Sequence, residues 1–198
     1  MFTGIVQEIG TVVKRQASRG VVRLTIQAPK TAARVRPLES VAVNGACLSV
    51  VAVARGALAF EMIPETQRLT TLGALRIGDP VNLEPSLSLT DRLNGHVVLG
   101  HVDGVGRVIK RQQRRGELVL TIRVAPPLRR LLVPKGPVTV DGVSLTVGQR
   151  LTASSCAVHL IPETLRRTTL RCREVGDVVN IELDYLAKLV AQVLVSRR

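Results

Sequence analysis

The sequence predicts an all-β protein made of two small antiparallel β-barrels in series, followed by a C-terminal helix. Three observations support this fold class. Apolar residues form 45% of the 198-residue chain while aromatic residues form only 2%, so aliphatic and β-branched side chains, which favour strands, must fill the core. Short apolar runs alternate with turn signals about every ten residues. The chain also contains a long internal repeat.

The repeat is clearest in one ten-residue segment. Ile63–Leu72 recurs as Ile161–Leu170 with eight of ten positions identical. Two further segments recur in the same order and at nearly the same separation: Val43–Val50 as Val140–Val147, and Ile77–Glu84 as Val175–Glu182. Chance does not produce such agreement in a short chain, so we infer a tandem duplication. The predicted units are an N-terminal barrel over residues 1–96, a C-terminal barrel over residues 97–185 and a helix over residues 186–198.

Local patterns predict the elements of each copy. Residues 21–26 and 118–124 are rich in β-branched residues with part-alternating polarity, which is typical of strands. Asn44-Gly45 and Asp141-Gly142 lie inside apolar runs and predict tight turns, because glycine accepts a positive φ. The segment after Pro64 predicts a brief helix. Many short strands in so small a unit favour a closed or nearly closed barrel, which removes exposed strand edges.

The C-terminal segment has the pattern of a helix. Its apolar residues recur at i, i+3, i+4, i+7 and i+8, namely Leu186, Leu189, Val190, Val193 and Leu194. Asp184 can cap the start, and Arg197 and Arg198 suit the negative end of the helix dipole. A helix of this length is marginal alone in water. It therefore either covers its own barrel or mediates self-association, and its wide apolar surface favours self-association.

The composition argues against several classes of function. The net charge is +13, and basic residues gather over residues 107–115 and 166–173, so positive potential could steer an anionic or electron-rich small molecule. Proteins that bind single-stranded nucleic acid interleave aromatic residues for base stacking, and this chain has almost none, so we expect no nucleic-acid partner. No apolar run approaches the roughly 20 residues that span a bilayer, and no signal-peptide pattern is present. We expect a soluble, cytoplasmic protein without membrane association.

The cysteines and histidines do not predict a metal site. Cys47, Cys156 and Cys172 lack Cys-x-x-Cys spacing, and the three histidines add no ligand pattern. A disulfide framework is equally unexpected for an odd number of cysteines. Each thiol can also be explained as a small buried apolar group.

Six separated motifs carry a resemblance to one family. They are Met1–Val6, Asn44–Leu48, Gly100–Gly104, Asp141–Thr146, His159–Thr164 and Val179–Asp184. In these motifs, and in its duplication, the chain resembles riboflavin synthase of the α-chain type along its whole length. The resemblance implies two similar six-stranded Greek-key barrels, each of which binds one molecule of 6,7-dimethyl-8-ribityllumazine. It also implies a homotrimer held by the C-terminal helices, with each active site between the first barrel of one subunit and the second barrel of its neighbour.

The resemblance also implies a reaction. One lumazine transfers a four-carbon unit to a second lumazine, which yields riboflavin and 5-amino-6-ribitylaminouracil without a cofactor or metal. Association with lumazine synthase is a further partnership that the family suggests. A duplicated binding unit would hold donor and acceptor face to face, and such positioning can lower a barrier by about 7–11 kcal/mol. The alternatives are a non-catalytic lumazine or flavin carrier on the same fold and a basic interaction protein, which the repeat disfavours.

Differences between the two copies point to catalytic residues. Cys47 and Ser144 occupy the same place after a tight turn, and the resemblance puts both in the active site. By their chemistry, Cys47 is a candidate nucleophile or acid, and Ser144 a hydrogen-bonding group or a stabiliser of water bound to the ring. His101 has an aliphatic counterpart and so also differs between the copies. The resemblance adds Asp184 as an active-site carboxylate and Lys135 as a ligand contact across the subunit boundary. Packing is the alternative role for Cys47 and Ser144, and a structural role is the alternative for His101.

Backbone and hydroxyl groups are expected to bind the substrate. The pteridine edge offers amide-like donors and acceptors to strand-edge backbone groups, and the ribityl chain needs polar partners. The predicted substrate-binding residues are Gly4, Ile5, Val6, Ser40, Cys47, Leu48, Ser49, Glu61, Met62, Ile63, Pro64, Glu65, Thr66, Gly100, His101, Val102, Lys135, Ser144, Leu145, Thr146, His159, Leu160, Ile161, Pro162, Glu163 and Thr164. Turn or cap chemistry is the alternative role for Thr66 and Thr164. Ala46 stands where some relatives have a second cysteine, and Ser49 replaces the threonine that is common in the family.

Overall fold

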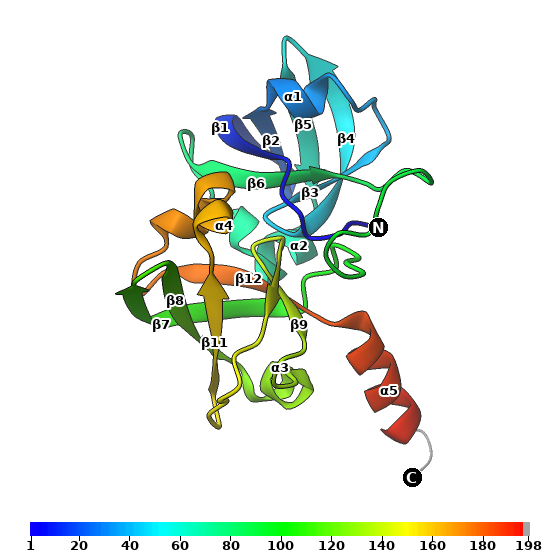
Figure 1. The fold of residues 1–198 in the computed structure, drawn as a ribbon. Coiled ribbons are helices and arrows are strands. Elements are labelled where there is room, and N and C mark those ends of the chain that lie inside the picture. The colour runs from blue at the N-terminus through cyan, green and yellow to red at the C-terminus, as the bar shows by residue number, and fades with distance from the viewer. Residues whose placement is uncertain (196–198) are drawn as a thin grey trace.

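The first half of the chain is a closed barrel of six antiparallel strands (Figure 1). The structure is a computed structural model that describes residues 1–195. Around the barrel the strands follow the order β1-β2-β5-β4-β3-β6. Their bounds are β1 Glu8–Ser18, β2 Val21–Gln27, β3 Ser40–Val43, β4 Ala46–Ala54, β5 Ala57–Met62 and β6 Pro80–Pro85.

The second half repeats this topology. Its strands are β7 Gly104–Arg114, β8 Glu117–Val124, β9 Pro137–Val140, β10 Val143–Thr146, β11 Ser155–Leu160 and β12 Val178–Leu183. They form a sheet in the order β10-β9-β12-β7-β8-β11, which matches the first barrel strand for strand. Because β10 is much shorter than β4, β10 and β11 are joined only by an isolated bridge between Val147 and Val158. The predicted all-β class with two tandem six-stranded units is confirmed, and the second unit has a weak seam in its wall.

Each unit contains the tight turn that the sequence predicts. Asn44-Gly45 joins β3 to β4 with φ angles of 43° and 82°, and Asp141-Gly142 joins β9 to β10 with φ angles of 45° and 79°. The two turns touch, since a Cβ atom added to Gly45 would lie 2.7 Å from the amide nitrogen of Gly142. Glycine is required there both by the positive φ and by the close approach of the two backbones.

Short helices connect the strands. Helices α2 (Pro64–Leu69) and α4 (Pro162–Arg167) begin at the proline of the repeated segment, which confirms the brief helix expected there. Each is followed by a 3₁₀ helix, and a threonine hydroxyl caps each 3₁₀ helix by accepting a backbone hydrogen bond. The remaining bounds are η1 Thr71–Ala74, η2 Thr169–Cys172, α1 Pro29–Ala32 and α3 Pro126–Leu131.

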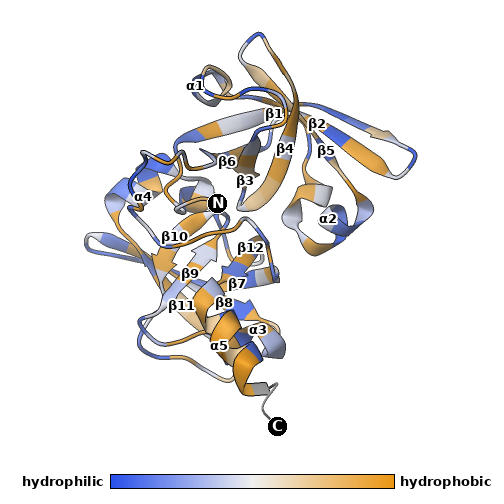
Figure 2. Ribbon diagram, turned by 90° about the vertical axis from the view of Figure 1, so that its right-hand side faces the viewer, coloured by the Kyte–Doolittle hydropathy of each residue, from blue (hydrophilic) through white to orange (hydrophobic). Residues whose placement is uncertain are grey.

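Each unit has its own hydrophobic core. Leu24 and Phe60 are fully buried in the first, and Leu120 and Leu160 are fully buried in the second. Complete burial of such a side chain contributes about 1.5–3 kcal/mol to stability. Hydrophobic and hydrophilic residues both occur along the strands (Figure 2). The strand side chains that point into each barrel fill its core, and those that point outward are available to contact other groups.

The chain start of each copy crosses over to the other unit. The amide of Ser144 donates to the carbonyl oxygen of Gly4, and the amide of Cys47 donates to the carbonyl oxygen of Gly100, both at 2.8 Å. The two bonds occupy equivalent places in the repeat. The segment before the first strand of each copy therefore lies beside the candidate catalytic residue of the opposite copy.

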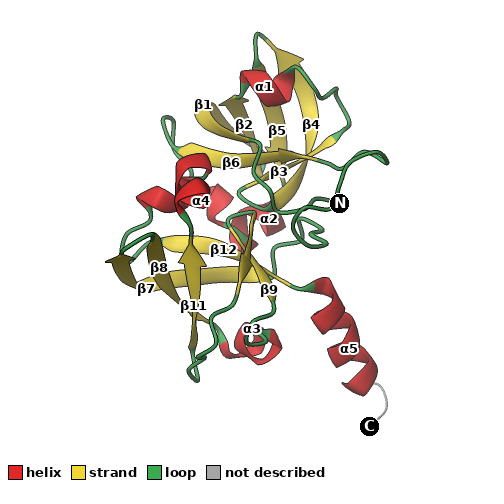
Figure 3. Cartoon of the chain, in the orientation of Figure 1, coloured by secondary structure: helices red, strands yellow, loops and turns green. Residues whose placement is uncertain are grey.

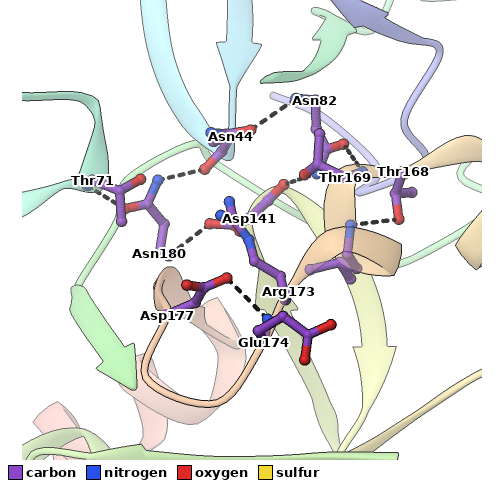
Figure 4. Close-up of polar contacts among 11 residues, drawn as sticks. Asn44, Thr71, Asn82, Asp141, Thr168, Thr169, Arg173, Glu174, Asp177 and Asn180 are labelled. Atoms are coloured by element: carbon purple, nitrogen blue, oxygen red, sulfur yellow. Dashed lines mark hydrogen bonds and ion pairs between the residues drawn. The ribbon is translucent and has the colours of Figure 1, made fainter. Parts of the chain in front are cut away.

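Two buried asparagines also join the units (Figure 4). The side-chain nitrogen of Asn82 donates to the carbonyl oxygen of Asp141 at 2.9 Å, and its Oδ1 accepts from the amide of Thr169 at 2.8 Å. Asn180 makes the corresponding pair of bonds to the first unit. Since buried polar groups are costly to leave unpaired, these bonds hold the two units in one relative orientation.

Helix α5 (Tyr185–Val195) extends from the end of β12, away from the first unit and near α3 of the second (Figure 3). Asp184 lies at its start as predicted, and its Oδ1 accepts a hydrogen bond from the amide of Leu186 at 3.2 Å. The ammonium group of Lys188 pairs with the carboxylate of Asp103 at 2.9 Å. This ion pair ties the helix to the second unit, where α5 also contacts α3.

The apolar face of α5 is open to solvent. Leu186, Val190 and Leu194 are each more than 60% exposed, so this face does not cover the barrel of its own chain. The predicted arginines at the end of the helix, Arg197 and Arg198, lie outside the described residues. Within the described part of the chain, no helix has the length and apolar character needed to cross a membrane.

Candidate functional site

A cavity of about 880 Å³ lies on the outer face of the second unit. Outward-facing side chains of β7, β8, β10 and β11 form its walls, together with residues 147–150 that follow β10. The cavity spans the seam at which β10 and β11 meet only through one bridge. The early end of β10 therefore creates the hollow.

Ser144 and His96 meet in the wall of this cavity. The Nδ1 atom of His96 lies 2.7 Å from the Oγ atom of Ser144, and its Nε2 atom lies 3.3 Å from the hydroxyl of Thr139. His96 belongs to the connection between the two copies. A Cβ atom on the preceding residue, Gly95, would lie 2.0 Å from the carbonyl oxygen of Thr3. Only glycine lets this connection pass close enough to bring His96 onto Ser144.

The charge state of His96 suits proton transfer. Burial lowers the pKa of the imidazole below its usual value of 6.5, and the carboxylate of Asp184 offsets part of this effect. The neutral imidazole that results at pH 7 has one nitrogen that donates and one that accepts. Ser144 and Asp184, two of the predicted catalytic residues, thus both act on the same histidine.

Many of the substrate-binding residues predicted from the second copy line this cavity. Its walls include Lys135, Ser144, Leu145, Thr146, His159, Ile161 and Thr164. The side chain of Leu160 points into the core instead, so only its backbone can face a ligand. Pro162 and Glu163 begin helix α4, where the Glu163 carboxylate pairs with Arg166 and Arg167.

The predicted residues of the first copy occupy equivalent places on the first unit. Cys47 is half-buried on β4, and Ser40 and Ser49 are partners across β3 and β4. Ile63 and Thr66 lie at the start of α2, like their counterparts at α4. The side chains of Leu48 and Met62 are buried in the first core. Pro64 and Glu65 lie at the start of α2, where Glu65 pairs with Arg68. Glu61 lies 3.7 Å from Arg23.

The crossing segments bring the remaining predicted residues to the opposite unit. Ile5 follows the Gly4 carbonyl that binds Ser144, whereas His101 follows the Gly100 carbonyl that binds Cys47. The side chain of Val6 packs into the core of the second unit, and that of Val102 packs against the core of the first. The predicted catalytic residues therefore fall into two groups, one of Ser144 and Asp184 with His96, and one of Cys47 near the segment of His101.

The three cysteines differ in chemical availability. None forms a disulfide. Burial raises the pKa of Cys156 to about 11, so this residue stays a protonated thiol near neutral pH. Cys172 is exposed at the end of η2, and Cys47 is half-buried beside a crossing segment. In the described part of the chain, no group of three or more His, Cys, Asp or Glu side chains is arranged to hold a metal ion.

Several cavity residues were not predicted from the sequence. Among them are His96, Gln112, Arg114, Gln149 and Arg150. His96 lies in the connection between the copies and has no counterpart in the first copy, so comparison of the repeats could not identify it. The two arginines stand at positions that are uncharged in the first copy, and that difference was a usable signal.

Comparison with known proteins agrees with this architecture. The model of the lumazine binding domain matches the chain twice, over residues 3–86 and 99–184. Riboflavin synthase of Mycobacterium tuberculosis (strain ATCC 25618 / H37Rv) is 42% identical over 200 residues, which cover 99% of this chain and 99% of that protein. Riboflavin synthase of Bacillus amyloliquefaciens is 39% identical over 194 residues, which cover 98% of this chain and 90% of that protein.

Solved structures of LumP have the same fold. The crystal structure of LumP complexed with riboflavin has a TM-score of 0.87 at 25% identity and covers 93% of this chain and 100% of that one. LumP complexed with flavin mononucleotide has a TM-score of 0.83 at the same identity. With two matched lumazine binding domains and full-length relatives above 30% identity, this chain belongs to the riboflavin synthase family.

Proposed function

We propose that this protein is a transferase that converts two molecules of 6,7-dimethyl-8-ribityllumazine into riboflavin and 5-amino-6-ribitylaminouracil. The observation that carries this proposal is the duplicated binding unit, in which the copies keep the same fold but place different reactive groups, Cys47 and Ser144, at one equivalent position. The two products together contain all the atoms of the two substrates. The reaction therefore balances without an oxidant, a reductant or a cofactor.

Positioning supplies much of the catalysis in this proposal. Each unit holds one lumazine, and the two rings face each other in the assembled enzyme. Holding two reactants in a near-attack geometry can lower the barrier by about 7–11 kcal/mol. Hydroxyl groups such as those of Thr146 and Thr164 in the cavity wall bind the ribityl chain.

Ser144 and His96 move a proton in the second unit. The first chemical step removes a proton from the 7-methyl group of one lumazine, and the neutral imidazole of His96 accepts it, directly or through Ser144. The electron pair left on the methyl carbon adds to an electrophilic C=N bond of the other lumazine, so that a carbon–carbon bond forms and the π electrons move to the ring nitrogen, which takes up a proton. Cleavage of two C–N bonds in the donor then releases 5-amino-6-ribitylaminouracil and leaves the four carbons on the acceptor. Asp184 stabilises the imidazolium that results. Cys47 acts on the lumazine bound to the first unit, as acid or nucleophile, with His101 nearby.

The site requires a second copy of the chain. Among the described residues, none from strands β1 to β6 lines the cavity of the second unit. A lumazine bound there would face solvent in the isolated chain, so the first unit of another subunit must cover it. The exposed apolar face of α5 is the means of self-association, and we propose a homotrimer. A cytoplasmic location and an association with lumazine synthase also remain predictions from the family.

A flavin or lumazine carrier is the second candidate. The fold match to LumP complexed with 6,7-dimethyl-8-(1'-D-ribityl) lumazine favours binding of this kind of ligand, and binding alone would satisfy a carrier. The His96–Ser144 pair, which binding does not need, favours the enzyme.

Incubation with substrate separates the two candidates. Purified protein is mixed with 6,7-dimethyl-8-ribityllumazine, and riboflavin formation is followed by its fluorescence. The enzyme produces riboflavin and 5-amino-6-ribitylaminouracil in equal amounts. Tight binding of lumazine without riboflavin formation would instead identify a carrier.

A further inference from the structure

The cavity of the second unit carries three cationic side chains. Arg114, Lys135 and Arg150 line it, whereas none of the described aspartates or glutamates does. The equivalent positions of the first copy hold uncharged residues, namely Ser18, Leu38 and Val53. The duplication thus provides an internal comparison in which one site has gained positive charge.

Two of these positions, those of Arg114 and Lys135, correspond in structure as well as in sequence. Arg114 and Ser18 each end the first strand of a hairpin, where they pair with the first residue of the next strand. Lys135 and Leu38 have φ angles of 63° and 75°, and the amide of each donates to the carbonyl oxygen of a valine. At these two positions the backbone is conserved between the copies while the charge is not. Arg150 differs, because it follows the end of β10 while Val53 lies within β4.

The remaining wall positions do not cancel the difference. His159 of the second unit corresponds to Glu61 of the first, and Val119 corresponds to Arg23. Arg23 and Glu61 pair with each other at 3.7 Å, so they neutralise one another. The cavity of the second unit therefore carries two cationic side chains without an acidic partner, Lys135 and Arg150, beside Arg114, which pairs with Glu117 at 3.7 Å, whereas the equivalent surface of the first unit carries no unpaired charge at these positions.

The cations are available for a ligand. Within the described residues, Lys135 and Arg150 take part in no ion pair, and Arg114 has only a 3.7 Å contact with Glu117. Glu117 also accepts a bond from His159 at 2.7 Å. An uncharged ribityl chain needs hydroxyl and backbone partners, and two unpaired cations beside the paired Arg114 exceed that need. A phosphate monoester carries about −1.5 to −2 charges at pH 7 and three acceptor oxygens, which arginine and lysine recognise well.

We propose that the cavity of the second unit prefers ribityl ligands that end in a phosphate monoester, and that flavin mononucleotide bound there competes with lumazine. The ring and ribityl part of this proposal rests on the proposed function, and the three cations carry the phosphate part. The consequence is inhibition of the enzyme by the phosphorylated form of its own product. The reaction that consumes the product is then a phosphoryl transfer to the ribityl terminus.

Binding measurements at two salt concentrations test this proposal. Quenching of flavin fluorescence gives the dissociation constants of riboflavin and flavin mononucleotide for the full-length protein. We expect flavin mononucleotide to bind one site per chain about tenfold more tightly than riboflavin at low salt, because two or three exposed ion pairs add up to roughly this factor. The ratio should approach one at high salt, since salt screens exposed charges.

Substitutions to the residues at the equivalent positions of the first copy test which side chains cause the preference for flavin mononucleotide. Arg114→Ser and Arg150→Val should each lower the preference for flavin mononucleotide several-fold, and together they should abolish it. Arg115→Ser is the matched control, because Arg115 adjoins Arg114 but does not line the cavity. It removes the same charge and should keep the preference. Inorganic phosphate at millimolar concentration should weaken binding of flavin mononucleotide and leave binding of riboflavin unchanged.

The outcomes separate this proposal from the proposed function. If riboflavin binds and is formed from lumazine but the two flavins bind equally at low salt, the phosphate preference is overturned and the enzymatic function stands. An equal loss of preference in Arg115→Ser and Arg150→Val would also overturn it, as would equal weakening of both flavins by phosphate. Absence of riboflavin binding together with absence of turnover would overturn both proposals.

Discussion

The Nδ1 atom of His96 lies 2.7 Å from the hydroxyl oxygen of Ser144, although 47 residues separate the two in the chain. The crossing of the two copies creates this contact, because the connection that carries His96 must pass over the second unit before β7 begins. A base and a hydroxyl thus meet in the wall of a cavity that could hold a lumazine.

Removal of either member of this pair should slow the chemical step. We expect Ser144→Ala and His96→Gln each to lower kcat by about 10²–10⁴-fold, with a much smaller change in the affinity for lumazine. Because the two groups act as a unit, the double variant should lose little more than either single variant. Steady-state kinetics and equilibrium binding provide both quantities. A loss of affinity that matches the loss of kcat would show that the pair only binds the ligand.

The pH dependence of His96 has a defined sign. Since burial lowers its pKa, the unfolded chain takes up a proton near pH 6.5 while the folded protein does so only at lower pH. Stability should therefore fall as the pH drops below about 6.5 and should level off below the lowered pKa. Thermal unfolding between about pH 5 and pH 8 measures this trend. The His96→Gln variant should lack this pH-dependent part of the stability. Its NMR spectrum should also lack the imidazole signals of His96, which assigns those signals in the spectrum of the unmodified protein. The assigned signals should titrate below pH 6.5.

Cys47 should matter for turnover more than the other cysteines. We expect Cys47→Ala to lower turnover more than it lowers lumazine affinity, because the thiol is proposed to act on the lumazine of the first unit. Cys172→Ala is the control, since Cys172 is exposed at the end of η2. Riboflavin formation under substrate saturation compares the two. Comparable activity of both variants would leave Cys47 with a packing role.

Helix α5 should be necessary for assembly. Deletion of residues 186–198 should produce monomers with little activity, because no residue of β1 to β6 among those described lines the second cavity of the same chain. Sedimentation velocity and riboflavin formation measure the two effects. The paired substitution Leu189→Glu with Val193→Glu places charges on the exposed apolar face and should act like the deletion. A fully active monomer would contradict the shared site.

Asp141 and Arg173 form an ion pair at 2.7 Å that the first copy lacks. Asp141 is fully buried, and burial raises its pKa while Arg173 offsets part of the increase. Arg173→Leu should lower the free energy of unfolding by about 3–5 kcal/mol, because it leaves a buried carboxylate unpaired. The double variant with Asp141→Asn copies the Asn44–Leu75 pair of the first copy and should recover most of that loss. Chemical denaturation measures the free energy of unfolding of both variants. An equal loss in the single and the double variant would show that the unpaired Asp141 carboxylate does not destabilise the protein.

The fold and half of the site could be predicted from local patterns. The two tight turns need glycine at positive φ, and the short helices begin at a proline, so these elements depend on neighbouring residues alone. The duplication made the two units and the Cys47–Ser144 equivalence visible without coordinates. The apolar face of α5 also follows from its spacing, whereas the structure shows that this face is exposed.

The rest of the site depends on contacts between distant segments. Nothing near His96 in the chain indicates that it meets Ser144, since the contact arises only when the connection between copies crosses the second unit. The cavity itself exists because β10 ends early and leaves a seam beside β11.

The sequence by itself thus determined which strands, turns and paired units form, because those follow from the conformational preferences of adjacent residues and from repetition. Only the tertiary structure decided which histidine faces Ser144 and which cationic side chains line one cavity, because such contacts depend on how segments pack after the chain has closed on itself.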